Sequence, residues 1–126
     1  MRSLSLVAIA LFVWSGCAAS SGDRTAADVS PDTITAEEIA AFETSYPSAT
    51  AYDLVDRLHR TWLFTREAGT EVHVYQGSQY LGNVDALRQL QTAAIVQIER
   101  LDSRIAQARY GRMRNHSSGA LVVTFR

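Results

Sequence analysis

The sequence predicts a small α/β (α+β) domain, in which short helices pack on a mixed sheet of about four strands. Three observations lead to this prediction. Apolar residues recur at helical spacing in some segments, short runs between them have strand-like character, and the last run, "ALVVTF", is apolar except for one threonine. With 126 residues, 47% of them hydrophobic and 20% charged, the chain has the length and composition for one compact core.

The N-terminal segment, residues 1–16, has the layout of a secretory signal peptide. Arg2 precedes the apolar run "LSLVAIALFVW", which is shorter than the roughly 20 apolar residues of a transmembrane helix, and small residues follow. The chain's only cysteine, Cys17, comes next. Because a lone cysteine forms no internal disulfide, its position favours lipid attachment. The alternative is that the signal is cleaved a few residues further on and removes Cys17 with it.

The stretch "WSGC" resembles the lipobox of bacterial lipoproteins, in which the cysteine is acylated and becomes the new N-terminus. This resemblance implies a membrane anchor at Cys17, which is stable when two or more acyl chains are attached. Ala18 stands where an aspartate would imply retention in the inner membrane, so the implied location is the outer membrane, facing the periplasm or the cell surface. Residues 17–32, small and polar, predict a flexible tether to a folded domain at 33–126.

Two helices are predicted at the start of this domain. "TAEE", beginning at Thr35, has the form of a capping box and predicts a short helix. A longer helix is predicted over residues 51–63, because its apolar residues share one stripe at helical spacing. These residues are Ala51, Leu54, Val55, Leu58 and Trp62. Asp53 and Asp56 each precede an arginine by four positions, which predicts exposed ion pairs.

The second half of the domain alternates strands and short helices. "EVHVYQ" (71–76) alternates in strand fashion, and a Gly-Ser turn leads into the returning strand "QYL" (79–81). Asn83 is predicted to cap a short helix that runs to Leu90, and a strand follows at 95–101. A helix is predicted over 103–110, with Gly111 as a left-handed cap. The apolar run 120–125 predicts a central strand covered on both faces.

The ordered set of segments resembles the plug domain of TonB-dependent outer-membrane receptors, from about Thr33 to Arg126. The matching segments are "TAEEIA", "AYDLVDRL", "VHVYQGSQYLG", "IVQIERL", "ARYG" and "SGALVVTFR". The resemblance implies a plug-like sandwich. A large plugged barrel uses 22 strands of about 9 to 11 residues each. We therefore expect a stand-alone plug-like domain without a barrel, which does not transport by itself.

A short segment ahead of the first helix admits two interpretations. "DTITA", formed by Asp32, Thr33, Ile34, Thr35 and Ala36, resembles the TonB box, which pairs with TonB by strand addition. Alternatively, the same residues are only the first strand and the cap of the plug-like fold. The first interpretation predicts an accessory or regulator of TonB-coupled uptake that engages TonB through residues 32–36.

The candidate partner-binding residues lie around the predicted loop "RMRNHSS" (112–118) and on the hairpin. They are Arg109, Arg112, Arg114, His116, Tyr75 and Tyr80. Guanidinium groups bind carboxylates and phosphates through paired hydrogen bonds, which suits a protein partner, an acidic glycan or a lipid headgroup. The alternative for the basic residues is a solvated loop. The alternative for the two tyrosines is simple pairing across the strands.

No catalytic, metal or cofactor site is predicted. The three histidines lack the spacing that places two ligands on one helix face, and no glycine-rich phosphate loop or nucleophile elbow is present. A net charge of −1 favours no nucleic-acid partner. The sequence therefore predicts a non-catalytic binding or assembly module at the outer membrane, with an unidentified envelope protein as partner. A hydrolase site formed by the loops is a further alternative.

Overall fold

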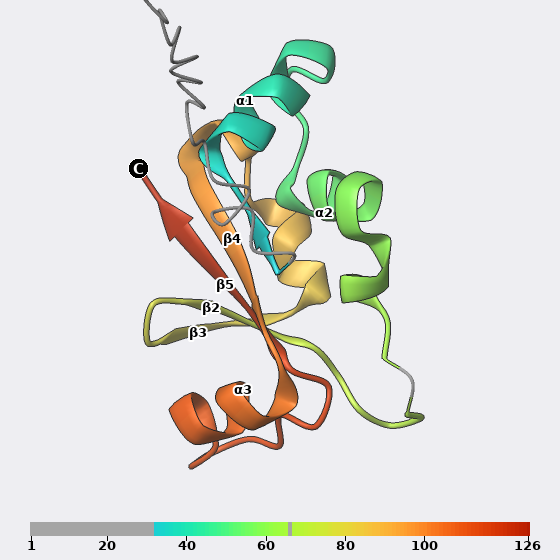
Figure 1. Ribbon diagram of the computed structural model, residues 1–126, viewed down its shortest axis with the longest axis vertical. Helices are drawn as coiled ribbons and strands as arrows, with labels where there is room; N and C mark the ends of the chain where they lie inside the picture. The colour runs from blue at the N-terminus through green and yellow to red at the C-terminus, as the bar shows by residue number, and fades with distance from the viewer. Residues whose placement is uncertain (1–31, 66) are drawn as a thin grey trace, which may run out of the picture.

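A computed structural model describes residues 32–65 and 67–126. The fold is α+β, with short helices packed on a mixed five-stranded sheet (Figure 1). The predicted signal peptide, Cys17 and the tether up to residue 31 lie outside the described residues. The elements are β1 (Thr33–Ile34), α1 (Ala36–Ser45), α2 (Ala51–His59), η2 (Arg60–Leu63), β2 (His73–Gln76), β3 (Gln79–Asn83), η3 (Val84–Gln89), η4 (Thr92–Ala94), β4 (Ile95–Leu101), α3 (Ser103–Tyr110) and β5 (Ala120–Phe125).

The sheet has five strands, where about four were predicted. The additional strand is β1, which pairs antiparallel with β4 through Thr33 opposite Glu99 and Ile34 opposite Ile98. A strand of 2 residues is too short to show the alternation from which the other strands were predicted. The predicted number of strands was therefore too low by one.

The strand order is β1-β4-β5-β2-β3, which places β5 in the middle of the sheet. It pairs antiparallel with β4 and parallel with β2, so the sheet is mixed. Its first four residues are buried, which confirms the predicted central strand covered on both faces. An unbroken apolar run suits this position because neither face of the strand meets water.

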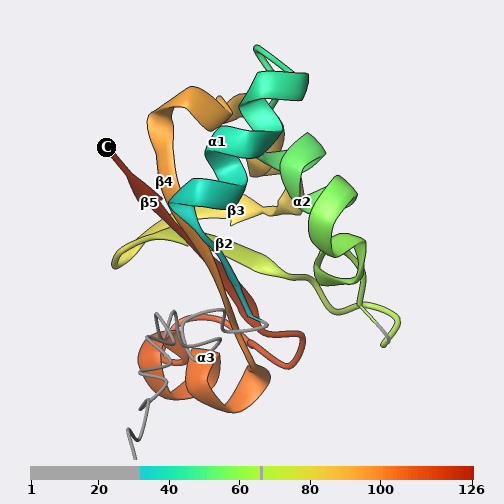
Figure 2. The same cartoon turned by 45° about the horizontal axis from the view of Figure 1, so that its top comes forward.

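Alternate residues of the central strands enter two separate cores. Val74, Leu121 and Val123 face α1 and α2 in the larger core. Tyr75 and Val122 point the other way, into a smaller core beneath α3. This is the period of two expected of a sheet with both faces covered. Figure 2 shows α1 and α2 together at one end of the molecule and α3 at the other.

The capping boxes determine where both N-terminal helices begin. The predicted box at Thr35 is confirmed, since the Glu38 carboxylate accepts the Thr35 amide at 2.8 Å. A second box, at Thr50, was not predicted, and its acidic partner is Asp53, which accepts the Thr50 amide at 2.9 Å. These hydrogen bonds from Thr50 lower the pKa of Asp53.

The second helix differs from its prediction in two respects. It is α-helical only to His59 and continues as the 3-10 helix η2 to Leu63. Trp62, in the 3-10 segment, is buried, whereas Leu58, in the α-helical part and predicted on the same stripe, is 40% exposed. The predicted ion pair between Asp56 and Arg60 is confirmed at 3.4 Å. No helix within the described ranges has both the length and the apolar character of a membrane span.

Helix α3 has the predicted bounds but not the predicted end. Gly111 has φ −67°, so it is right-handed, and the predicted left-handed cap is wrong. The Gln107 side chain instead bonds the Gly111 carbonyl at 3.1 Å. A Cβ at position 111 would overlap the Gln107 carbonyl oxygen and side chain. Glycine is needed at position 111 because Gln107 approaches its Cα closely, and not because of a positive φ.

Candidate binding site

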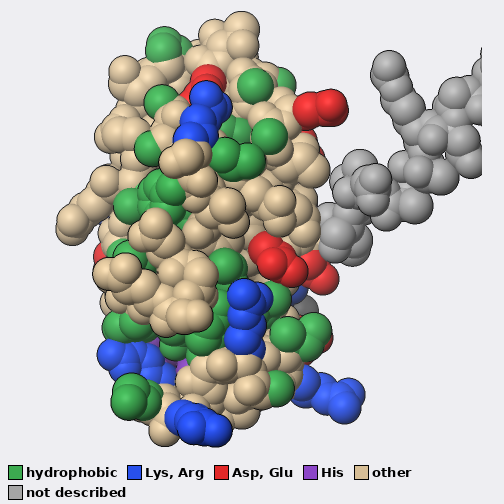
Figure 3. Space-filling model, turned by 90° about the vertical axis from the view of Figure 1, so that its left-hand side faces the viewer, with side chains coloured by type: hydrophobic (Ala, Val, Ile, Leu, Met, Phe, Trp, Pro, Cys, Tyr) green, Lys and Arg blue, Asp and Glu red, His purple; other side chains and the backbone are tan. Residues whose placement is uncertain are grey.

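The loop between α3 and β5, residues 111–119, carries most of the predicted basic surface. Arg112 and Arg114 are exposed, as a surface role requires. His116 is 0% exposed and lies beneath the loop, so it is not available to a partner. Figure 3 shows basic side chains gathered at the end of the molecule where α3 lies. The structure thus separates His116 from the arginines with which it was grouped.

His116 belongs to a cluster of rings between β2, β3, α3 and the loop, which we call the aromatic cluster. Its members are His73, Tyr75, Tyr80, Tyr110 and His116. Tyr75 stacks on Tyr110 with a centroid distance of 3.9 Å. Tyr75 is also opposite Tyr80 in the hairpin, at 5.4 Å between rings, which confirms the cross-strand pairing considered from the sequence. The tyrosine rings therefore serve mainly as packing for the smaller core.

A buried hydrogen bond joins the loop to the sheet. The Tyr75 hydroxyl and His116 Nε2 are 2.7 Å apart. Burial, together with the neighbouring His73, lowers the pKa of His116, and burial raises the pKa of Tyr75. Both groups are therefore neutral at pH 7. His116 Nδ1 is buried with no hydrogen-bond partner among the described residues.

The contacts of His73 define its tautomer. Its Nε2 lies 3.1 Å from the carbonyl oxygen of Asn115, which only accepts hydrogen bonds, so Nε2 carries the proton. In the neutral ring Nδ1 is then an acceptor, and it lies 3.4 Å from the Tyr80 hydroxyl. His73 thus links the hairpin to the loop through a hydrogen bond on each side of its ring.

Further hydrogen bonds hold the loop in one conformation. The His116 amide donates to the Gln107 side chain at 3.1 Å, and the Ser118 hydroxyl donates to the Thr70 hydroxyl at 2.6 Å. Together with the bonds of His73 and Tyr75, they tie the loop to α3, to β2 and to the segment ahead of β2. An irregular segment tied in this way loses little entropy when it binds a partner.

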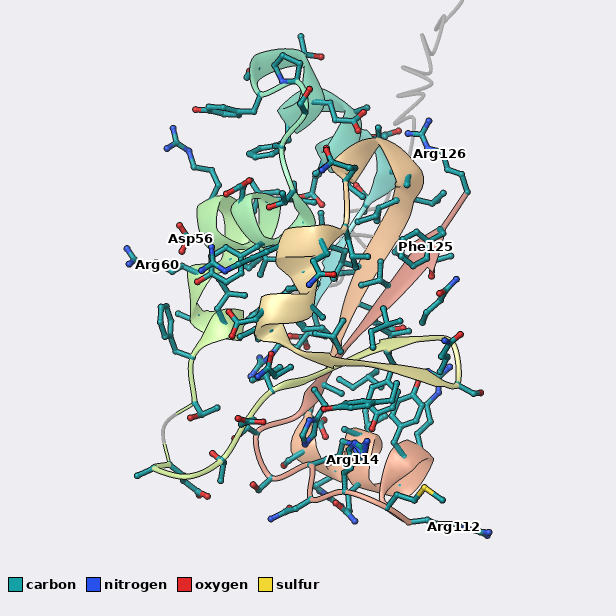
Figure 4. All side chains as sticks on the ribbon, turned by 180° about the vertical axis from the view of Figure 1, so that it is seen from behind. Asp56, Arg60, Arg112, Arg114, Phe125 and Arg126 are labelled. Atoms are coloured by element: carbon teal, nitrogen blue, oxygen red, sulfur yellow. The ribbon has the colours of Figure 1, made fainter. Side chains whose placement is uncertain are left out.

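Two of the three arginines around this loop lie against aromatic rings. The guanidinium carbon of Arg114 lies 3.6 Å from the Tyr80 ring centroid, and that of Arg109 lies 5.3 Å from the Tyr110 ring. Neither of them, nor Arg112, forms an ion pair with any residue in the ranges 32–65 and 67–126. Figure 4 shows Arg112 reaching away from the molecule and Arg114 close to the aromatic cluster. Their guanidinium groups keep free donors for an external anion.

The segment Asp32–Ala36 is part of the fold. Thr33 and Ile34 pair with β4, Ile34 is fully buried, and Thr35 caps α1. Ala36 is the first residue of α1, and Asp32 lies 3.5 Å from Arg100 as an ion pair. Engagement of TonB by strand addition through this segment would therefore require β1 to leave β4 or to accept a strand at its outer edge.

The third histidine lies outside the aromatic cluster. His59 stacks on Trp62 with a centroid distance of 4.2 Å, away from the other histidines. Among the described residues, no group of three or more His, Cys, Asp and Glu side chains is placed to hold a metal ion. His73 and Tyr110 were missed as neighbours of the arginines. The alternation of "EVHVYQ", which puts His73 and Tyr75 on one side of the strand, was the available signal for His73.

The arrangement of the arginines is suited to the recognition of anions. Fixed guanidinium groups beside rings are suited to carboxylates and phosphates. The buried Tyr75–His116 pair is neutral and lies below the surface, so it meets no substrate from solvent. Comparisons of the chain with protein-family models, with curated proteins and with solved structures find no match in any of the three.

Proposed function

We propose that the chain is a lipid-anchored protein of the outer membrane that acts as a non-catalytic binding or assembly module, facing the periplasm or the cell surface. The signal-like segment 1–16 and the lipobox-like "WSGC" support the location. The ordered plug-like segments support a plug-like domain. The proposed partner is an envelope protein that presents acidic groups.

The observation that carries the binding role is the ordered loop between α3 and β5. Hydrogen bonds from His73, Tyr75 and Gln107 tie it to the rest of the fold, while Arg112 and Arg114 remain exposed. An ordered loop that presents arginines without ion-pair partners within the described residues is suited to recognition.

The lipid anchor has a direct test. Mass spectrometry of the mature protein from bacterial envelopes should find an N-terminal Cys17 carrying acyl chains. Cys17→Ala should move the protein from the membrane fraction to the soluble fraction, because acylation supplies the attachment. An unacylated N-terminus that begins after Cys17 would contradict the anchor.

The binding role is tested by recovery of partners from native envelopes. We expect the full chain, cross-linked in place, to recover a defined envelope protein. A double variant, Arg109→Gln with Arg112→Gln, should reduce this recovery at least tenfold, because the loss of charge-assisted hydrogen bonds costs about 1.5–3 kcal/mol each. Quantitative mass spectrometry of the cross-linked products measures the effect.

The matched control is a double variant outside α3 and the α3–β5 loop, on α2 and η2, Arg57→Gln with Arg60→Gln. These arginines are exposed and also lie near aromatic rings, those of Tyr46 and Phe64. Recovery should be unchanged in the control. Equal losses in the two double variants would show that the binding depends on total charge, and would contradict recognition by the α3 end.

A further inference from the structure

A polar groove lies beside the aromatic cluster, between the segment that leads into β2 and the α3–β5 loop. Its volume is about 580 Å³, within the range of small-molecule sites. The lining residues are Gly69, Thr70, Glu71, His73, Arg114, Asn115 and Ser117. None of them is aliphatic, so the groove is suited to a polar ligand. Arg112 does not line the groove and reaches away from the molecule (Figure 4).

The groove carries one cation and one anion that do not neutralise each other. Arg114 and Glu71 both line it, and both side chains belong to exposed residues. Neither forms an ion pair with the other or with any other described residue. Arg114 lies against the Tyr80 ring at 3.6 Å, which restricts its position. Opposite charges lining one groove without pairing leave both available to a ligand.

Neutral donors line the same groove. The Asn115 side-chain oxygen accepts the Ser117 amide at 3.1 Å, so its NH₂ group remains free to donate. The Ser117 hydroxyl also remains free among the described residues, whereas Thr70 is engaged by Ser118 and by the Glu67 carbonyl. A phosphate or carboxylate held by Arg114 would find these additional donors nearby.

We infer that this groove binds a small zwitterionic group, in which a phosphate or carboxylate meets Arg114 and an ammonium a few bonds away meets Glu71. This inference rests on the proposed function, because Arg114 belongs to the same ordered loop, and it names the ligand chemistry of that end of the molecule. A purely anionic ligand would be repelled by Glu71, and a purely cationic one by Arg114. Only a ligand that carries both charges is attracted by both Arg114 and Glu71.

The test is titration of the full chain, purified in nonionic detergent, with four probes followed by NMR or calorimetry. Phosphoethanolamine represents a lipid headgroup, and β-alanine represents a free amino acid with the same two-carbon spacer. Inorganic phosphate and ethanolamine are the separate halves. We expect at least one zwitterion to bind at least tenfold more tightly than either half, and the better of the two identifies the source.

Single variants test whether Arg114 and Glu71 each contribute to binding of the zwitterion. Arg114→Gln and Glu71→Gln should each weaken binding of the zwitterion at least tenfold. Arg104→Gln and Glu67→Gln are matched controls, since both residues are exposed and neither lines the groove. The controls should bind as the wild type does, and thermal unfolding shows that each variant is folded.

Two results would overturn the inference. If phosphate alone binds as tightly as the zwitterions and Glu71→Gln strengthens it, the groove is a simple anion site. If no probe produces saturable binding, the groove holds no ligand of this class. Either result leaves the proposed function standing, because that proposal is tested with Arg109 and Arg112 through recovery of an envelope partner.

Discussion

Replacing His116 by alanine is expected to lower the free energy of unfolding by about 2–4 kcal/mol. The imidazole is fully buried beneath the α3–β5 loop, so its removal leaves a cavity. It also leaves the Tyr75 hydroxyl, which lies 2.7 Å from His116 Nε2, without its partner in the interior. Urea unfolding followed by circular dichroism measures the loss.

Two variants separate these causes. Tyr75→Phe removes only the hydroxyl and keeps the stacking on Tyr110, so it should cost less than His116→Ala, about 1–2 kcal/mol. His59→Ala removes a half-buried histidine that stacks on Trp62 elsewhere in the fold, and should cost about 1 kcal/mol. A loss for His116→Ala no greater than that for His59→Ala would contradict the structural role of His116.

The His116→Ala variant should also change how the free energy of unfolding depends on pH. Because burial lowers the pKa of His116 in the folded state, the unfolded chain binds a proton that the folded chain does not. The contribution of His116 is therefore fully present above its unfolded pKa of about 6.5, and is lost as the pH falls toward the lower folded value. Urea midpoints at a series of pH values should decline less steeply below about 6.5 in His116→Ala than in the wild type.

Gly119→Ala is expected to destabilise the fold by about 3 kcal/mol or more. Gly119 has φ +82°, which L-residues rarely adopt, and a Cβ there would overlap the backbone carbonyl oxygen of Leu101. Because Leu101 is the last residue of β4 and Gly119 precedes β5, the overlap would separate the central strands at their shared end. The change is measured as the free energy of unfolding in urea.

Gly69→Ala is the matched control for backbone strain alone. Gly69 has the same φ of +82°, but a Cβ there would meet no atom within 4 Å. The control should cost about 1–2 kcal/mol, the penalty of a left-handed residue with a side chain. Similar losses at the two positions would show that strain at φ, and not contact with β4, explains Gly119.

Much of the fold was predictable because local signals and tertiary packing agree. "ALVVTF" is apolar at every strand position up to its last residues, and it is the central strand. The capping box at Thr35 begins α1 as predicted. The box at Thr50 has the same threonine-to-acid spacing, but Asp53 was interpreted as an ion-pair partner of Arg57. A side chain with two local partners is assigned only by the geometry that excludes one of them.

The candidate site was less predictable than the fold. The arginines were identified because an exposed basic loop is visible in composition. His116 was predicted to lie at the surface with these arginines, but it is buried. The burial was not predictable, because a histidine in a polar loop carries no local sign that it packs against a strand. Tyr75 and His116 are 41 positions apart in the chain, so only the parallel pairing of β2 with β5 brings them together.

The sequence by itself determined the order of helices and strands and the identity of the central strand, because hydrophobic period and helix caps act over a few residues. Only the tertiary structure decided that β1 joins the sheet, that His116 lies inside the fold, and that Glu71 and Arg114 line one groove. The physical reason is that these features depend on contacts between distant segments, which arise when the sheet brings its strands together.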